Sequence, residues 1–312
     1  MSKDEQKKTD DQASRRDFLK KMGLAAGAVA LAGGGLGLAR SLAAGTKSGE
    51  KMKVMTTDGG VAEVDKSDVI SSDPHTTIKE GREGIKGRKF VMVIDLSRCQ
   101  NARKCMEACQ AAHELRTEQH HINVLTMQDT PHTAPYHMPK PCFHCDNPPC
   151  VKVCPVDATF KRQDGIVLID NERCIGCRFC VAACPYSARV FHWHEPLHSN
   201  PEEKSRPYDV ELNVPQRKGT ISKCLFSADR LRDGELPYCV SACPNGVYYF
   251  GDINEDAVTN GTTKETVRFS DLIRDNHGYT YFEDLGTKPQ VYYLPPKNRR
   301  IPFVPPAEET TA

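Results

Sequence analysis

The chain has 312 residues, a length that allows one large domain or two small ones. Its 42 basic and 41 acidic residues nearly balance, so no strong field is available to bind nucleic acid or an anionic membrane surface. Only 38% of the residues are hydrophobic, yet there are 14 cysteines. This combination indicates that bound metal supplies part of the folding free energy.

The N-terminus predicts an export signal over residues 1–44. Arg15 and Arg16 precede a weakly apolar stretch rich in Ala, Gly and Leu at residues 22–39, and the small residues 42–44 suit a cleavage site. This pattern resembles a twin-arginine signal, which exports proteins already folded and therefore suits a cofactor inserted beforehand. The many glycines make the stretch a poor membrane-spanning helix.

Two segments follow before the first cysteine. Residues 45–88 are polar and lack a clear period, which predicts an extended or partly disordered arm. The apolar run Lys89–Asp95 predicts the first strand, which leads directly into the first cysteine group.

Two later segments predict strands that follow a Cys-Pro pair. Residues 155–170 predict a hairpin, with strands at Val156–Lys161 and Ile166–Ile169. Val247–Phe250 repeats this strand after another Cys-Pro pair. Beyond residue 251 the cysteines stop, and we expect a C-terminal extension over residues 251–312.

That extension has two parts, which differ in amino-acid composition. Residues 251–294 are polar, and residues 295–306 are rich in proline. The proline-rich tail is expected to be extended chain, either free or lying along a partner.

The cysteines form four groups, which we interpret as an internal repeat. The third reads C-x2-C-x2-C-x3-C-P, the run typical of bacterial ferredoxins, and the second differs only by a longer middle gap. In chain order the groups are Cys99, Cys105 and Cys109; Cys142, Cys145, Cys150 and Cys154; Cys174, Cys177, Cys180 and Cys184; and Cys224, Cys239 and Cys243.

The spacing suits iron–sulfur chemistry. A cubane cluster needs four thiolates at tetrahedral corners, and C-x2-C-x2-C reaches three of them from one tight loop. Cys180 and Cys184 are four residues apart, so they share one face of a helical turn and can contact two neighbouring clusters. Adjacent clusters without a substrate pocket indicate an electron wire rather than a catalyst.

Three other interpretations of the cysteines are weaker. Zinc sites rarely use four cysteines within eleven residues followed by proline. Disulfides suit an exported protein, but crowded C-x2-C spacing is poor disulfide geometry. Covalent haem would need C-x-x-C-H, which the sequence lacks.

The four groups, placed after a twin-arginine signal, resemble the four-cluster iron–sulfur subunits of the molybdopterin oxidoreductase (dimethyl sulfoxide reductase) superfamily. The resemblance covers residues 89–250, and residues 283–295 look weakly like that family's C-terminal region. It implies an α+β fold of two ferredoxin-like modules related by a pseudo-two-fold axis. Groups one and four would form one module, and groups two and three the other.

The resemblance also implies the ligand sets. Two of these sets are complete and would each hold a [4Fe-4S] cluster. One is Cys142, Cys145, Cys150 and Cys184, and the other is Cys174, Cys177, Cys180 and Cys154.

The other module departs from the family pattern, because Ala102 and Ser227 stand where a second cysteine is expected in groups one and four. Three alternatives follow: each site holds a three-iron cluster, Ser227 supplies an oxygen ligand, or the module is structural without clusters. The incomplete sets are Cys99, Cys105 and Cys243, and Cys224, Cys239 and Cys109.

A few other side chains have two interpretations. The histidines at positions 120, 121, 192, 194 and 198 are expected in solvated loops, since no carboxylate or cysteine completes a ligand set. His144 either donates a hydrogen bond to a cluster sulfur or lies on the surface. Phe191 and Trp193 are expected in the core or against a partner. Basic residues such as Lys104, Arg178 and Lys223 either offset cluster charge or are solvated.

Together these observations predict an electron carrier that makes and breaks no substrate bonds. By resemblance, its partners would be a polytopic membrane subunit that handles quinone and a molybdopterin catalytic subunit or multihaem cytochrome. The signal places it on the periplasmic side of the cytoplasmic membrane. A scaffold with two structural clusters, or an enzyme with a substrate at an open iron site, are the alternatives.

Overall fold

The computed structural model describes residues 51–55, 61–65, 77–197 and 206–297. The predicted export signal, His198 and most of the proline-rich tail lie outside these ranges. The described residues form a mixed fold of short helices and strands, as predicted. The pseudo-two-fold relation between two modules stays a prediction.

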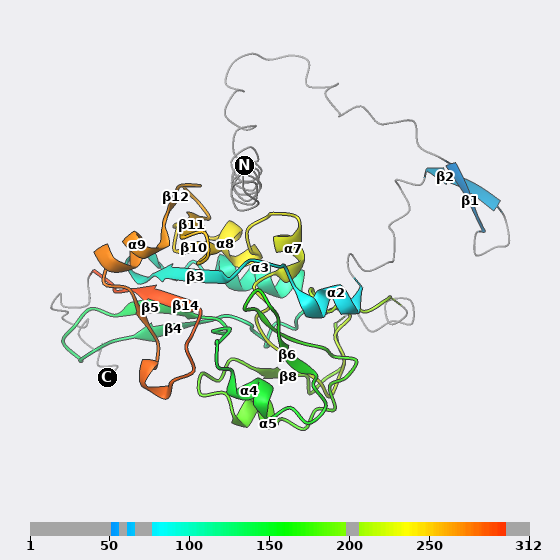
Figure 1. The fold of residues 1–312 in the computed structure, drawn as a ribbon, viewed down its shortest axis with the longest axis horizontal. Helices are drawn as coiled ribbons and strands as arrows, with labels where there is room; N and C mark the ends of the chain where they lie inside the picture. Colours follow the sequence, from blue (N-terminus) through cyan, green and yellow to red (C-terminus); the bar gives the residue numbers. More distant parts are fainter. Residues whose placement is uncertain (1–50, 56–60, 66–76, 198–205, 298–312) are drawn as a thin grey trace, which may run out of the picture.

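A six-stranded sheet lies at the centre of the fold, in the order β12-β11-β10-β3-β14-β13 (Figure 1). Strand β3 pairs antiparallel with β10 and parallel with β14. The strands are β3 (Phe90–Asp95), β10 (Tyr248–Asp252), β11 (Ala257–Asn260), β12 (Thr266–Arg268), β13 (Tyr279–Thr280) and β14 (Val291–Leu294).

Strand β3 is buried along its whole length, as expected for a central strand whose residues are almost all apolar. Because side chains alternate across a strand, Met92 and Ile94 point into the main core while Val91 and Val93 join a second cluster. Helix α9 (Phe269–Asp275) covers that second cluster with Phe269 and its apolar neighbours. The predicted strand at Lys89–Asp95 is therefore confirmed.

Three antiparallel pairs of strands connect the cysteine groups. In each of them, one strand follows a Cys-Pro dipeptide and the other strand precedes a cysteine group. They are β6 (Thr159–Lys161) with β7 (Val167–Ile169), β8 (Val190–Phe191) with β9 (Ile221–Ser222), and β10 with β3. The first pair confirms the predicted hairpin at residues 155–170. The hairpin of β4 (Asn123–Met127) and β5 (Tyr136–Lys140) precedes the second group.

Short helices carry many of the cysteines. In the view of Figure 1, α3, α7 and α8 lie beside β3 and β10, while α4 and α5 lie at the opposite end with β6 and β8. These helices are α3 (Lys104–Ala112), α4 (Pro149–Lys152), α5 (Phe179–Ala182), α7 (Ala228–Arg232) and α8 (Tyr238–Ala242). The remaining elements are β1 (Lys51–Met55), β2 (Val61–Asp65), α2 (Ile78–Glu83), η1 (Leu96–Arg98) and η2 (Glu283–Leu285).

The prediction of an extended arm through residue 88 is wrong for its last part. Helix α2 begins with a capping box between Thr77 and Glu80. Arg82 then lies 4.0 Å above the Phe160 ring and forms an ion pair with Asp157. These contacts attach the segment to the hairpin β6–β7. Strands β1 and β2 also pair with each other earlier in the arm.

The expected polar extension after residue 251 is also wrong as a description of structure. Residues 257–294 supply four strands of the central sheet. Val291 and Tyr293 in β14 are fully buried against β3. None of the helices in the described parts of the chain is long and apolar enough to cross a membrane.

Candidate metal centres

Four cysteines line one cavity, which we call the Cys142 site. Cys142 and Cys145 follow β5, Cys150 lies in α4, and Cys184 follows α5. The cavity contains about 340 Å³ of space between protein atoms, part of it open to solvent. Burial, together with the neighbouring thiols, raises the pKa of Cys145 to about 12. Such thiols ionise together only when cations such as iron offset their charge.

Arg189 lines the same cavity and supports the fit of an anionic sulfur cluster. Its Nη1 donates to the Thr159 hydroxyl at 3.1 Å, whereas its buried Nη2 has no hydrogen-bond partner. Burial opposes its charge, but the Cys150 and Cys180 thiols raise the pKa of Arg189. A cluster sulfur would accept the hydrogen bond that this guanidinium group otherwise lacks.

His144 also lines this cavity and is only 1% exposed, so the surface interpretation of this residue is wrong. Its Nδ1 accepts the Val167 amide proton at 3.1 Å, which leaves the ring proton on Nε2. Burial and the nearby Lys223 lower the pKa of His144 well below its usual value, although the Cys224 carbonyl opposes this. The buried Nε2–H makes no hydrogen bond of normal geometry and is a donor suited to a cluster sulfur.

A second cavity, the Cys174 site, is lined by Cys174, Cys177, Cys180 and Cys154. Cys177 is exposed, whereas Cys180 is buried. The Thr159 amide donates to the Cys154 sulfur at 3.4 Å. The last cysteine of group two thus lies with group three, and Cys184 of group three lies with group two. This exchange is the arrangement typical of two-cluster ferredoxins.

The loop of the Cys174 site depends on Gly176. This residue has φ +69°, and a Cβ there would lie 2.0 Å from the Gly219 carbonyl oxygen. Only glycine therefore allows the loop to pack against the chain before β9.

Three thiols meet at what we call the Cys99 site. Burial raises the pKa of both Cys99 and Cys105, and the Cys243 thiol raises it further in each case. Arg103 precedes α3 with φ 55°, as Arg178 precedes α5 with φ 63°. The group-one loop therefore keeps the backbone turn of the complete group-three loop, although the exposed Ala102 replaces its second cysteine.

The remaining three thiols form what we call the Cys224 site, and all three are buried. Burial raises the pKa of Cys224 to about 11 and that of Cys109 and Cys239 well above its usual value. Ser227 is also buried, and its hydroxyl oxygen accepts the Tyr238 amide proton at 3.1 Å. That bond holds the hydroxyl group at the start of α8.

Each of the four sites neighbours the next in the order Cys99, Cys224, Cys142 and Cys174, and we call this series the row of sites. At each of the three boundaries between neighbouring sites, a thiol of one site raises the pKa of a thiol in the other, in addition to the effect of burial. The pairs are Cys105 with Cys109, Cys142 with Cys224, and Cys150 with Cys180.

Lys223 lies between the Cys224 and Cys142 sites and is completely buried, so the solvated interpretation is wrong for it. Its ammonium group donates to the Cys224 carbonyl at 2.7 Å and to the Val167 carbonyl. Burial lowers the pKa of Lys223, whereas the Cys142 and Cys224 thiols oppose this. A buried cation at this position offsets thiolate charge.

The expectation of solvated histidines is wrong for His121 and His192, which are buried, and correct for His194, which is exposed. His113 is also buried, and the sequence interpretation missed it. The spacing in the sequence could have indicated this residue, because His113 lies four residues after Cys109 and so shares the face of α3 that carries Cys109.

Comparison with known proteins supports iron–sulfur binding by this chain. Residues 133–200 match the family model of a 4Fe-4S dicluster domain. A selenate reductase subunit from Mesobacillus selenatarsenatis is 34% identical over 90% of this chain and 97% of its own length. The iron–sulfur cluster-binding subunit of menaquinone reductase from Nitratidesulfovibrio vulgaris is 35% identical, over 66% of this chain and 88% of its own. A tetrathionate reductase subunit from Salmonella typhimurium is 36% identical, over 69% and 76% respectively.

The fold and its cysteine cavities thus define an iron–sulfur protein of the ferredoxin-like class. More narrowly, the chain belongs to the family of iron–sulfur subunits of oxidoreductase complexes to which these relatives belong.

Proposed function

We propose that this chain relays single electrons between larger partners through iron–sulfur clusters at the Cys142 and Cys174 sites. The observation that carries the proposal is the pair of adjacent cavities, each lined by four thiols. Bound there, [4Fe-4S] clusters would accept and release one electron each without breaking a substrate bond. The chain supplies the thiolates, and Arg189, between the two sites, supplies a positive charge.

The Cys99 and Cys224 sites each offer three thiols, the number that a [3Fe-4S] cluster can use. The preserved turn at Arg103 favours a three-iron cluster at the Cys99 site. At the Cys224 site the buried His113 and His121 lie beside Cys109 and offer a different set of ligands. The alternative function is a scaffold subunit whose two clusters, at the complete sites, are structural.

The partners we propose are a quinone-handling polytopic membrane subunit and a molybdopterin catalytic subunit or multihaem cytochrome. Support comes from the relatives, one of which is a subunit of menaquinone reductase and others of selenate and tetrathionate reductases. The twin-arginine pattern around Arg15 and Arg16 supports a location on the periplasmic side of the membrane.

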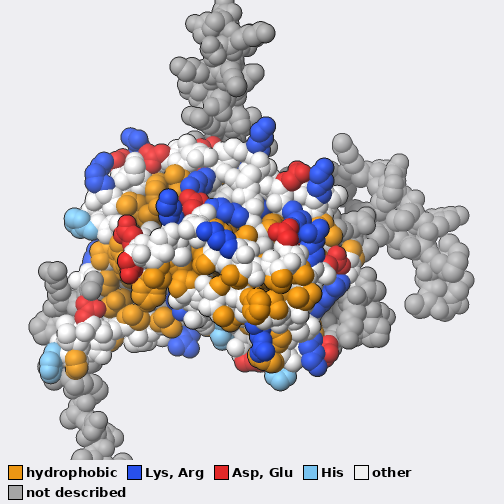
Figure 2. Space-filling view, turned by 60° about the horizontal axis from the view of Figure 1, so that its bottom comes forward, with side chains coloured by type: hydrophobic (Ala, Val, Ile, Leu, Met, Phe, Trp, Pro, Cys, Tyr) orange, Lys and Arg blue, Asp and Glu red, His pale blue; other side chains and the backbone are white. Residues whose placement is uncertain are grey.

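A docking face for one partner surrounds the Cys174 site. Ile175, Phe179 and Trp193, which we call the apolar face, are 63%, 61% and 59% exposed. Figure 2 shows hydrophobic side chains gathered on the side of the molecule that carries α4 and α5. Arg178 lies 5.0 Å above the Trp193 ring and joins the two parts of this face. Exposed apolar groups beside the exposed Cys177 favour electron exchange with a protein docked there.

The test is the iron and acid-labile sulfide content of anaerobically purified protein. Clusters at the two complete sites alone predict about 8 irons per chain, and a three-iron cluster at the Cys99 site raises this to about 11. Zinc without labile sulfide would contradict the proposal. About 8 irons combined with clusters that no quinol-linked partner reduces would favour the scaffold function.

A further inference from the structure

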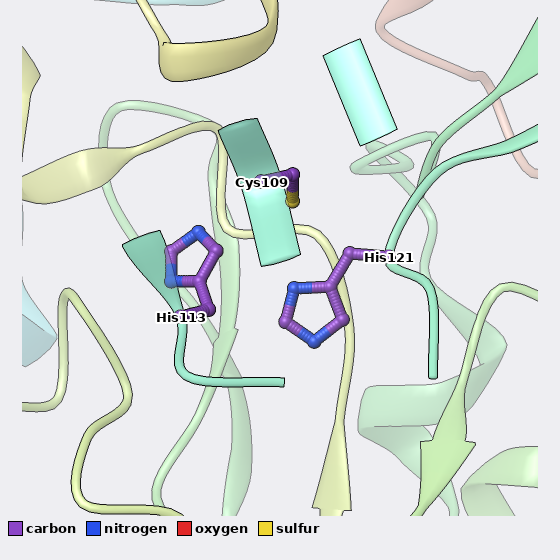
Figure 3. Close-up of side chains that lie close together, drawn as sticks. All are labelled: Cys109, His113 and His121. Carbon is purple, nitrogen blue, oxygen red and sulfur yellow. The ribbon is translucent and has the colours of Figure 1, made fainter. Parts of the chain in front are cut away.

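Three buried side chains beside the Cys224 site face one another. The Cys109 sulfur and one ring nitrogen each of His113 and His121 all lie within 4.8 Å of one another. Figure 3 shows the sulfur directed between the two imidazole rings, whose centroids are 5.2 Å apart. Cys109 lies in α3, His113 at its end, and His121 just before β4.

His113 is held in the form that binds metal. Its Nδ1 lies 2.8 Å from the Leu212 carbonyl oxygen, which can only accept, so Nδ1 carries the proton and Nε2 carries the lone pair. His113 is only 2% exposed, and burial favours the neutral ring. A histidine that donates one N–H to a backbone carbonyl and turns its other nitrogen to a metal is the usual arrangement of a histidine ligand.

His121 presents a free nitrogen in the same space. Its Nε2 lies 2.9 Å from the Ser222 hydroxyl, and its buried Nδ1 has no hydrogen-bond partner. His121 is only 3% exposed, and burial beside the Lys223 ammonium group favours its neutral ring. An unpaired buried polar nitrogen is costly unless something binds there.

The close approach of the three donor atoms suits one ion rather than separate corners of a cluster. Bond lengths of about 2.3 Å to sulfur and 2.0–2.1 Å to nitrogen place the ligands of a tetrahedral ion roughly 3.3–3.8 Å apart. In the described parts of the chain, no thiol set of the complete sites converges within 4.8 Å in this way. The thiols of the Cys142 and Cys174 sites instead surround cavities.

We propose that Cys109, His113 and His121 bind a single divalent transition-metal ion of the zinc class, in place of a cluster at the Cys224 site. One thiolate and two neutral imidazoles are a ligand set that suits such ions. Cys109 is then no longer available to the Cys224 site, which keeps only Cys224, Cys239 and the hydrogen-bonded Ser227 hydroxyl.

The charges around this site favour Cys109 as a thiolate when the ion is bound. The buried ammonium group of Lys223 disfavours further positive charge near His121, and the Cys109 thiolate would offset part of the ion's charge. An ion such as zinc is redox-inactive, so the relay would run through the Cys142 and Cys174 sites without crossing the Cys224 site. The proposal does not depend on the electron-transfer role.

The experiment compares full-length, anaerobically purified protein with His113→Gln and His121→Gln variants. Both substitutions keep a polar side chain of similar length and remove the imidazole. His194→Gln, at an exposed position, is the matched control. Each sample is analysed for all transition metals and for labile sulfide, and X-ray absorption is measured at the edge of any metal that lacks matching sulfide.

We expect about one ion per chain in excess of the cluster iron, with about one sulfur and two imidazole nitrogens around it. Each of the two histidine variants should lose this ion and keep its labile sulfide, and His194→Gln should keep both. Loss of about three irons together with sulfide would overturn the proposal, because the imidazoles would then belong to a cluster. An ion retained in both variants, or no excess ion in the parent protein, would overturn it too.

Discussion

At the residue scale, the cysteine sites differ in the side chains that surround them. The Cys142 site is lined by His144 and Arg189, and each offers a buried N–H without an acceptor. The Cys224 site is flanked instead by Lys223 and a pair of neutral imidazoles. Donors aimed at sulfur stabilise a cluster, whereas lone pairs beside a thiol bind a cation.

Lys223 should raise the potential of the neighbouring cluster, because a buried positive charge favours the reduced, more negative state. We expect Lys223→Met to lower the midpoint potential of the cluster at the Cys142 site by about 50–100 mV. A redox titration monitored by electron paramagnetic resonance measures this shift. Lys104→Met, which removes an exposed lysine paired with Glu107, should leave the potential unchanged. An equal shift in both variants would mean that net charge alone is responsible.

Gly176→Ala should empty the Cys174 site while leaving the Cys142 site filled. The new Cβ would collide with the Gly219 carbonyl, so the loop carrying Cys174 and Cys177 must move. We expect a loss of about 4 irons per chain. Gly234→Ala is the control, since Gly234 also has a positive φ but no neighbour within 4 Å of an added Cβ. Full iron content in Gly176→Ala would show that the close packing is dispensable.

Local spacing allowed the cysteine groups to be predicted, because a ferredoxin loop and its helical turn span only a few residues. The burial of His113, His121 and Lys223 depends on segments far apart in the chain, such as Leu212 and Val167. Sequence alone therefore placed these side chains in solvent or missed them.

At the element scale, the strand at Lys89–Asp95 and the hairpin at residues 155–170 were predictable because their apolar runs and turn are local. Strand β14 was not, since Val291–Leu294 is short and finds its place only by parallel pairing with β3, about 200 residues earlier. Helix α2 carries a local signal, the capping box between Thr77 and Glu80, but its contact with Phe160 is made across the fold.

Tyr293 connects β14 to the core, and its hydroxyl donates to the Pro139 carbonyl at 2.9 Å. We expect Tyr293→Ala to lower the free energy of unfolding by about 3–5 kcal/mol through the cavity it leaves. Tyr293→Phe should cost only about 1 kcal/mol, the worth of one hydrogen bond. Thermal unfolding of the holoprotein, followed by circular dichroism, ranks the two variants. Equal stability of the alanine variant and the parent would mean that β14 is not part of the folding core.

At the scale of the whole molecule, the row of sites ends at the apolar face. One end of the row, the Cys174 site, is near exposed Ile175, Phe179 and Trp193, whereas the thiols of the Cys142 and Cys224 sites are mostly buried. An electron would therefore enter or leave most readily at the Cys174 site, since short distances favour transfer.

The double variant Phe179→Ser/Trp193→Ser should slow electron exchange with the partner more than about 10-fold, because hydrophobic anchors at the centre of an interface carry much of its binding energy. Cluster content and potentials should stay unchanged. Phe282→Ser is the control, since Phe282 is exposed outside this face. Stopped-flow oxidation of the reduced protein by membranes containing the partner gives the rate. An unchanged rate would place the docking site elsewhere.

The most direct test of the central claim is a reductive titration of the anaerobic protein followed by electron paramagnetic resonance. Two adjacent [4Fe-4S] clusters predict about two one-electron paramagnetic centres per chain with signals broadened by their mutual interaction, besides the signal of any three-iron cluster at the Cys99 site. Loss of one such centre in Cys177→Ser or Cys145→Ser would assign each signal to its site. A protein that takes up no electrons at potentials where ferredoxin-type clusters are reduced would contradict the relay.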